Sequence, residues 1–216
     1  MIIRTTIAVL AVILAAAILP PPAAARFNLD YGVTFQERLL SSGGRHYEAR
    51  QLQLFLQPRI RLGRGWRAFL RLGYSNLSYD RPDREGRSYS RWGFSWGTGL
   101  GWTPLRWSGF YLDGEAAFFQ TRTSSSSTVG EYFNWGSDLR VGWDPGPADV
   151  YLGAAYDDGV VRDRSRGDSS RNDYRLRDPW NLFAGARLNL PVLPKLEARY
   201  YFWKDRLAVL GFTYQF

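Results

Sequence analysis

Phe212-Thr213-Tyr214-Gln215-Phe216 is the stretch of sequence that decides the fold. Its aromatic residues alternate with polar ones, and successive side chains of a β-strand point to opposite sides. One face of this segment is therefore apolar and the other polar. Chain ends tend to fray unless the structure holds them, so this ending predicts a terminal strand that is paired within a sheet.

The same alternation recurs along almost the whole chain after residue 26. The clearest segment sets Trp92, Phe94, Trp96, Leu100 and Trp102 against Arg91, Gly93, Ser95, Gly97, Gly99 and Gly101. Such a pattern is typical of strands with one apolar face. We count ten alternating segments and predict an all-β fold of ten antiparallel strands. Eight strands are the alternative, because the ninth segment, near residues 196–202, is short.

The first 25 residues have the features of a secretory signal peptide. Arg4 precedes an uncharged apolar run from Ile7 to Leu19, three prolines follow, and the small residues 23–25 offer a cleavage site. A membrane-anchor helix is the alternative, but the run is shorter than the roughly 20 residues that such a helix needs. We therefore predict cleavage after residue 25 and one mature domain, residues 26–216.

Composition narrows the classes of function. The formal net charge is +8, but 20 acidic residues are interspersed with the 28 basic ones, and no basic run suggests nucleic-acid binding. The chain has no cysteine, which excludes a disulfide, a thiolate metal site and a lipid-modified cysteine. Arginine supplies almost all of the positive charge, and arginine suits buried ion pairs and phosphate recognition.

The predicted connections fall into two classes. Short turns rich in Gly and Pro lie at residues 63–65, 103–108, 144–149 and 191–195, whereas longer polar loops lie near residues 40–48, 80–89, 122–130 and 157–178. Short turns on one rim and long loops on the other are typical of transmembrane barrels, in which the short turns face the periplasm.

Alternation alone does not say whether the apolar face meets lipid or a dry core. The opposite face mixes glycine with charges of both signs, which makes a poor solvent surface but leaves room inside a narrow barrel. Tryptophans also gather at both ends of the predicted strands, as in the aromatic girdles of membrane barrels. The predicted girdle comprises Trp66, Trp102, Trp107 and Trp143 beside the short turns, and Trp92, Trp135 and Trp180 toward the long loops. Both features favour a transmembrane, up-and-down β-barrel.

Taken together, the leader, the strands, the two rims and the terminal Phe216 resemble the small outer-membrane β-barrel proteins of the OmpA/OmpX-like family, which commonly have eight strands. The resemblance implies export through the periplasm into the outer membrane of a Gram-negative bacterium. It also implies periplasmic chaperones, lipopolysaccharide and the barrel-assembly machinery as partners, and we expect a monomer. The assembly signal would comprise Phe212, Tyr214 and Phe216.

Charged residues on the polar face are predicted to line the lumen. They are Asp30, Arg59, Arg61, Arg67, Arg71, Asp113, Glu115, Asp138, Arg140, Arg187, Glu197 and Arg199, together with Arg38 and Arg91. Isolated buried charges are costly, so we expect a plug of arginine–carboxylate pairs and a structural or surface-interaction role. The nine arginines exceed the five carboxylates, which leaves a narrow, weakly anion-preferring channel as the alternative.

The sequence offers little support for an enzyme. His46, the only histidine, lies near Ser41 and Ser42 in the first predicted loop, but no set of nucleophile, base and orienting residue is apparent. Omptin-type proteases also have ten strands, but their catalytic residues do not map onto this chain. The segment from Asp157 to Asp178 has six arginines and six aspartates, without the spacing of a calcium loop. We predict no catalytic, metal or cofactor site; a lipid-active enzyme or protease is the least favoured alternative.

Overall fold

The computed structural model describes residues 27–42, 45–80, 88–124, 128–165, 171–189, 195–203 and 206–215. The predicted signal peptide and Phe216 lie outside these residues. Within the described ranges, no helix is long and apolar enough to span a membrane.

All of the described elements are β-strands. In chain order they are β1 (Phe27–Ser42), β2 (Arg45–Gly63), β3 (Trp66–Asp80), β4 (Ser88–Trp107), β5 (Phe110–Ser124), β6 (Thr128–Trp143), β7 (Ala148–Ser165), β8 (Arg171–Leu176), β9 (Trp180–Leu188), β10 (Lys195–Tyr201) and β11 (Arg206–Gln215).

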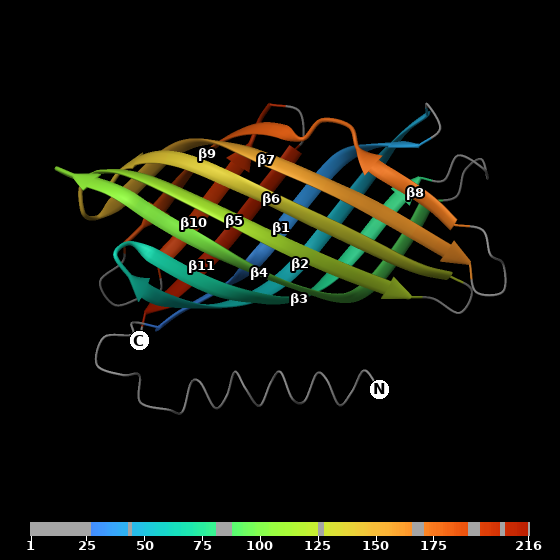
Figure 1. Ribbon diagram of the computed structural model, residues 1–216, viewed down its shortest axis with the longest axis horizontal. Coiled ribbons are helices and arrows are strands. Elements are labelled where there is room, and N and C mark those ends of the chain that lie inside the picture. Colours follow the sequence, from blue (N-terminus) through green and yellow to red (C-terminus); the bar gives the residue numbers. More distant parts are fainter. Residues whose placement is uncertain are drawn as a thin grey trace.

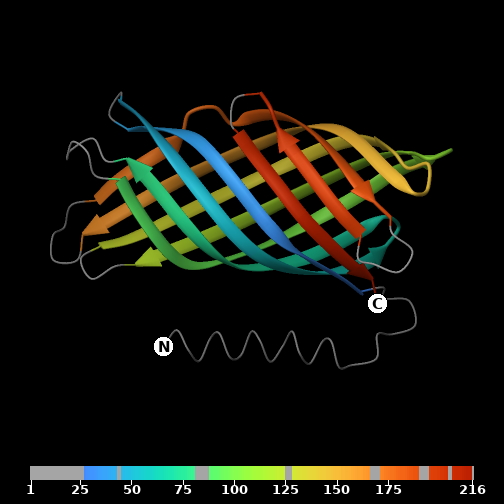
Figure 2. The same cartoon turned by 180° about the vertical axis from the view of Figure 1, so that it is seen from behind.

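The strands form one closed antiparallel barrel (Figures 1 and 2). Each strand except β8 and β9 pairs with both of its neighbours in sequence where the chain offers them. Strand β11 pairs with β1 from Asn28–Gln215 to Glu37–Arg206, which closes the sheet. Strands β8 and β9 occupy one position in the wall, because β7 pairs with β9 along its first half and with β8 along its second. The barrel therefore has ten strands, and the prediction of a ten-stranded barrel is confirmed.

The number of strands falls at one end of the barrel. The β10–β11 hairpin is short, and beyond its tip β8 pairs directly with β1 through Leu40–Leu176 and Ser41–Arg175. Eight strands, β1 to β8, thus continue past the hairpin as a narrower ring, which we call the collar (Figure 1). The opposite end carries the tight turns and the ends of β1 and β11 and, by the usual orientation of such barrels, faces the periplasm.

Three of the four predicted long loops, 40–48, 122–130 and 157–178, are largely strand, so this part of the sequence prediction is wrong. Most of the fourth, 80–89, lies outside the described residues. Strands β1 and β2 run through most of residues 40–48, and β7 and β8 occupy most of the Arg- and Asp-rich segment 157–178. Cross-strand pairing continues through this segment, for example Arg162 with Asp173. On the turn side, β4 extends to Trp107 through the predicted turn 103–108, and the chain reverses at Ser108 and Gly109, where both residues have positive φ.

The outside of the membrane barrel is apolar and carries two aromatic belts. All seven predicted girdle tryptophans are exposed, and Trp66 stacks on Trp102 at the turn end, whereas Tyr74 stacks on Trp92 toward the collar. Trp92 and Trp102 are ten residues apart on β4, or about 33 Å along the strand and about 25 Å along the axis of a tilted barrel. That height matches the apolar band of outer-membrane barrels.

Glycines on the inner face accommodate large side chains from the adjacent strand. Phe69 lies opposite Gly99, and Phe119 lies opposite Gly97; a methyl group on either glycine would overlap the facing ring. Tyr111 at Gly142, Tyr151 at Gly185 and Phe183 at Gly153 repeat the arrangement. The expectation that glycines leave room inside the barrel is therefore met by one arrangement: each glycine makes space for the ring of the residue directly paired with it.

Candidate functional site: the barrel lumen

The first cluster of lumen charges forms around Asp113. Its carboxylate accepts two hydrogen bonds from Arg67, at 2.5 and 2.8 Å, and it is also paired with Arg140, whose Nε lies 2.7 Å away. Thr103 donates a further hydrogen bond at 2.6 Å. Asp113 is 4% exposed. One buried carboxylate therefore ties β3, β4, β5 and β6 together near the periplasmic end.

A second cluster joins the wall from β6 to β10. Glu197 contacts both Arg187, at 3.1 Å, and Arg199, at 3.2 Å, and accepts a hydrogen bond from the Tyr151 hydroxyl at 2.6 Å. The same arginines also reach Asp149, at 3.0 Å from Arg187, and Asp138, at 3.3 Å from Arg199. Each of the three carboxylates in this cluster, Asp138, Asp149 and Glu197, therefore pairs with an arginine on another strand.

The third group lies on β1, β2, β3 and β5. Arg59 pairs with Asp30 at 2.8 Å and lies 3.8 Å from Glu115. Arg71 differs from the other lumen arginines, because its guanidinium meets no carboxylate within ion-pair distance among the described residues. It donates from Nε to Gln57 at 2.6 Å and lies 4.6 Å from the ring centre of Phe55 and 4.7 Å from that of Phe119.

The charges of the lumen balance, which corrects the excess of arginine expected from the sequence. Arg61, included in the prediction, is exposed at the turn end, whereas the structure adds Asp149 and Asp157, both paired with lumen arginines. Below the collar, the resulting set contains seven arginines (38, 59, 67, 71, 140, 187 and 199) and seven carboxylates (30, 113, 115, 138, 149, 157 and 197). The predicted Arg91 is also buried on the inner face, farther along the barrel, and the buried Asp163 adds the opposite charge at that end.

Two signals in the sequence could have found the missed carboxylates. Asp149 lies at the inner parity of its strand, two residues before Tyr151, and Asp157 lies six residues after Tyr151 on the same face. Both residues fall within predicted connections, 144–149 and 157–178. The alternation of inward and outward residues is therefore not extended to them in the sequence prediction. The structure extends β7 over both positions.

A cavity of about 170 Å³ occupies the lumen between these clusters. Its wall runs from Arg38 and Tyr132, at the lower edge of the collar, to Asp30 and Thr213, close to the periplasmic ends of β1 and β11. A water molecule needs only about 10–15 Å³ of such space, so the cavity has room for several waters or one small solute.

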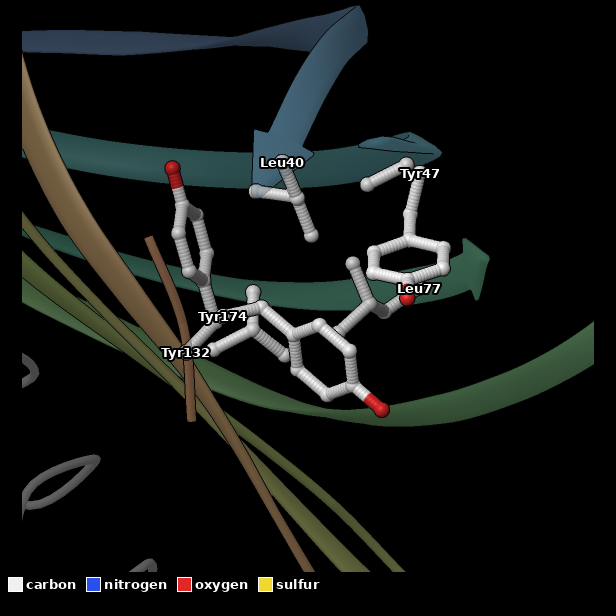
Figure 3. Close-up of a cluster of buried hydrophobic side chains, with 7 residues drawn as sticks. Leu40, Tyr47, Leu77, Tyr132 and Tyr174 are labelled. Carbon is white, nitrogen blue, oxygen red and sulfur yellow. The ribbon is translucent and has the colours of Figure 1, made fainter. Parts of the chain in front are cut away.

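The collar closes the lumen above the cavity. Its interior contains a cluster of buried apolar side chains, the collar core: Leu40, Tyr47, Ala49, Leu77, Tyr132, Val161 and Tyr174. Arg91 and Asp163 are buried beside this cluster, on the inner faces of β4 and β7. Figure 3 shows five of these side chains converging from β1, β2, β3, β6 and β8. Tyr47 and Tyr174 meet edge to face at 5.4 Å. At the boundary with the polar lumen, Arg38 donates to the Tyr132 hydroxyl at 3.0 Å and pairs with Asp157 at 2.9 Å.

The outer face of the collar is charged. Arg50 pairs with Glu37 and Glu48, each at 2.9 Å, and Arg122 lies 3.7 Å from Glu131. Hydrogen bonds with Glu48 and Glu37 raise the pKa of Arg50 above its ordinary value. Arg164, Arg175 and Arg177 are exposed on the same end of the barrel. Inside and outside are therefore reversed relative to the membrane barrel below.

Of the residues considered for chemistry, His46 has only its backbone in the described part of the structure. His46 is paired through its backbone with Ser41 in the β1–β2 hairpin. Among the described residues, no group of histidine and carboxylate side chains is arranged to hold a metal ion. Of the proposed assembly signal, Phe212 stacks on Tyr31 of β1, and Tyr214 pairs with Leu29 through its backbone.

Comparison with known proteins identifies the architecture. No protein-family model and no curated protein match the sequence. The structure is similar to the translocator domain of the autotransporter NalP from Neisseria meningitidis, with a TM-score of 0.50 and 12% identity, covering 99% of this chain and 96% of that chain. The outer-membrane protease OmpT from Escherichia coli is another similar structure, with a TM-score of 0.47 and 10% identity, covering 91% of this chain and 98% of that chain.

Identities this low show the fold alone. The fold is that of bacterial outer-membrane β-barrels, so the resemblance expected from the sequence is right at the level of architecture. A closed barrel with an apolar exterior also meets the physical requirement for spanning lipid, because all of its wall is paired. The chain is accordingly an integral outer-membrane β-barrel.

Proposed function

We propose that this barrel is closed toward the cell exterior and has a structural or surface-interaction role rather than a transport role. The observation that carries the proposal is the collar core, which fills the eight-stranded ring above the cavity. Barrels of about eight strands have interiors just wide enough for side chains to fill. A dry apolar constriction also opposes ion passage, because an ion there would lose its hydration.

The ion pairs of the lumen support the same role. A network that joins strands across the barrel braces the wall, and equal numbers of opposite charges give no reason for anion preference. The outer face of the collar then provides the interaction surface. We propose lipopolysaccharide as its nearest partner, since Arg175 and Arg177 are exposed a few residues from Trp180 and arginine binds phosphate well.

Conductance across planar bilayers tests this proposal. The purified, folded barrel should give no stable open level. The double variant Tyr132→Ala/Tyr174→Ala, which removes two rings of the collar core, should give openings. Arg122→Gln, on the outer face of the collar, is the matched control and should remain silent. A wild-type barrel with a stable open level would contradict the closed state.

A narrow channel is the second candidate, and the polar cavity favours it. A channel would require a path through the collar core that the Tyr132→Ala/Tyr174→Ala variant would widen rather than create. Wild-type conductance that falls when Arg59 or Arg71 is replaced would support this alternative. We propose no catalytic role; if any hydrolytic activity were found, its loss in His46→Ala would contradict that view.

A further inference from the structure

Arg71 is a cation held in place by neutral groups. Gln57 accepts a hydrogen bond from its Nε, and the rings of Phe55 and Phe119 lie within 5 Å of the guanidinium carbon. Its two Nη groups have no acceptor among the described residues, and the side chain lines the lumen cavity. A guanidinium fixed in this way is a ready partner for a carboxylate, which it can bind through two parallel hydrogen bonds.

The cavity also presents hydrogen-bond acceptors that no group in the described part of the chain satisfies. They are Oδ1 of Asn134 and Oδ1 of Asp138, both fully enclosed and both on residues that line the cavity. Buried polar atoms are rarely left without a partner. Neither oxygen has accessible surface as the side chains stand, so water or the ammonium group of a solute reaches them once these side chains turn toward the cavity.

The charge balance selects between classes of solute. Seven arginines and seven carboxylates make the lumen neutral, so a bound anion would leave one uncompensated negative charge at low dielectric, which is costly. A solute with both a carboxylate and an ammonium group adds no net charge. We propose that the cavity is a binding site for a small zwitterion of the amino-acid type, with its carboxylate on Arg71 and its ammonium group toward Asn134 and Asp138.

Access to this site is from the periplasm, a point that rests on the proposed closure by the collar. The cavity wall includes Asp30 and Thr213, which lie three and two residues from the described ends of β1 and β11. The collar core covers the other end. The barrel would then hold a periplasmic solute without passing it outward.

Side-chain NMR of the folded barrel in detergent micelles, labelled with ¹⁵N-arginine, tests the proposal. L-Alanine is the zwitterionic probe. Acetate has only the carboxylate of alanine, and methylammonium has only the ammonium group. L-Alanine should shift the Arg71 Nε signal saturably, with a Kd on the order of millimolar. Acetate and methylammonium should each bind at least tenfold more weakly.

Three variants locate the site. Arg71→Gln should weaken L-alanine binding at least tenfold, and Asn134→Leu, which removes an acceptor at similar volume, should weaken it several-fold. Arg50→Gln, on the outer face of the collar, should leave it unchanged. Migration of the unheated barrel on SDS gels verifies that each variant is folded; should Arg71→Gln fail to fold, Asn134→Leu and the three probes still decide.

The outcomes separate this proposal from the closed-barrel proposal. No saturable shift with any probe would mean a cavity filled by water only and would overturn the site. Equal binding of acetate and L-alanine, or unchanged binding in Arg71→Gln, would overturn it too. A barrel that conducts but still binds L-alanine through Arg71 refutes only the closure, whereas a silent barrel that binds no probe refutes only the site.

Discussion

The membrane barrel and the collar are built from the same strands but have opposite polarity. Between the two aromatic belts, Leu139 is 54% exposed, whereas its neighbours in sequence, Asp138 and Arg140, face the lumen and form ion pairs. In the collar, Leu40 is 1% exposed and lies inside, whereas Arg50 is on the outer face. The strands keep their two-residue period from the membrane barrel into the collar, and the chemistry of the two faces is exchanged.

This difference reflects the two solvents that the strands cross. In lipid, the exterior must be apolar, so polar groups are confined to the lumen, where they must pair. Outside the membrane, water covers the exterior, and the narrow ring can be filled by an apolar core as in a soluble protein. The exchange coincides with the tip of the β10–β11 hairpin, where the wall narrows from ten strands to eight.

The largest effect is expected from breaking the lumen cluster at Asp113. Asp113→Asn would leave Arg67 and Arg140 without their shared buried carboxylate, and breaking a buried pair costs about 3–5 kcal/mol. Urea unfolding in lipid vesicles, followed by tryptophan fluorescence, measures the loss. The control is Asp144→Asn, whose partner Arg106 is exposed; it should cost less than about 1 kcal/mol. Equal losses would show that the lumen pair is no more buried than a surface pair.

The collar core should respond as the interior of a soluble protein does. Leu40→Ala removes a side chain that is 1% exposed, and such changes cost about 2–5 kcal/mol. Leu39→Ala, at the adjacent residue that is 41% exposed, should cost less than about 1 kcal/mol. Proteolysis of the collar strands in intact vesicles measures the difference. Equal protease resistance in both variants would mean that the collar has no apolar interior.

Introducing a charge on the outer face sharpens the same contrast. Leu139→Arg places the charge between the belts, where lipid-facing arginine costs about 2–4 kcal/mol, whereas Leu39→Arg on the collar should cost close to nothing. Refolding yields and urea midpoints of the two variants in vesicles test this expectation. Equal tolerance at the two positions would place both in the same solvent.

The smallest effect is expected at the inner glycines. Gly97→Ala adds a methyl group against the Phe119 ring, and overpacking of this kind costs about 1–3 kcal/mol. Gly114→Ala is the control, because its methyl group would meet only ordinary contacts with Asp138 and Leu139. Urea midpoints provide the comparison, and identical values would mean that the ring of Phe119 moves away freely.

Alternation in the sequence was sufficient to predict the barrel, its ten strands and the outward position of the seven girdle tryptophans. The collar was missed because residues 40–48 and 157–178 are polar and resemble loops, although Tyr47, Val161 and Tyr174 share an inward parity that closes its core. Beyond the β10–β11 hairpin, β8 pairs directly with β1. The paired residues are far apart in the sequence, so no local pattern predicts this contact. The balance of lumen charge was missed for the same reason, since it required β7 to include Asp149 and Asp157.

The most direct test of the central claim is the solvent that each outward side chain meets. The chain has no cysteine, so a spin label on a single introduced cysteine at position 139 or 39 reports only that site. In vesicles, the label at 139 should be relaxed by oxygen, which concentrates in lipid, and the label at 39 by a water-soluble nickel complex. A label at 139 that responds to the nickel complex and not to oxygen would contradict the account.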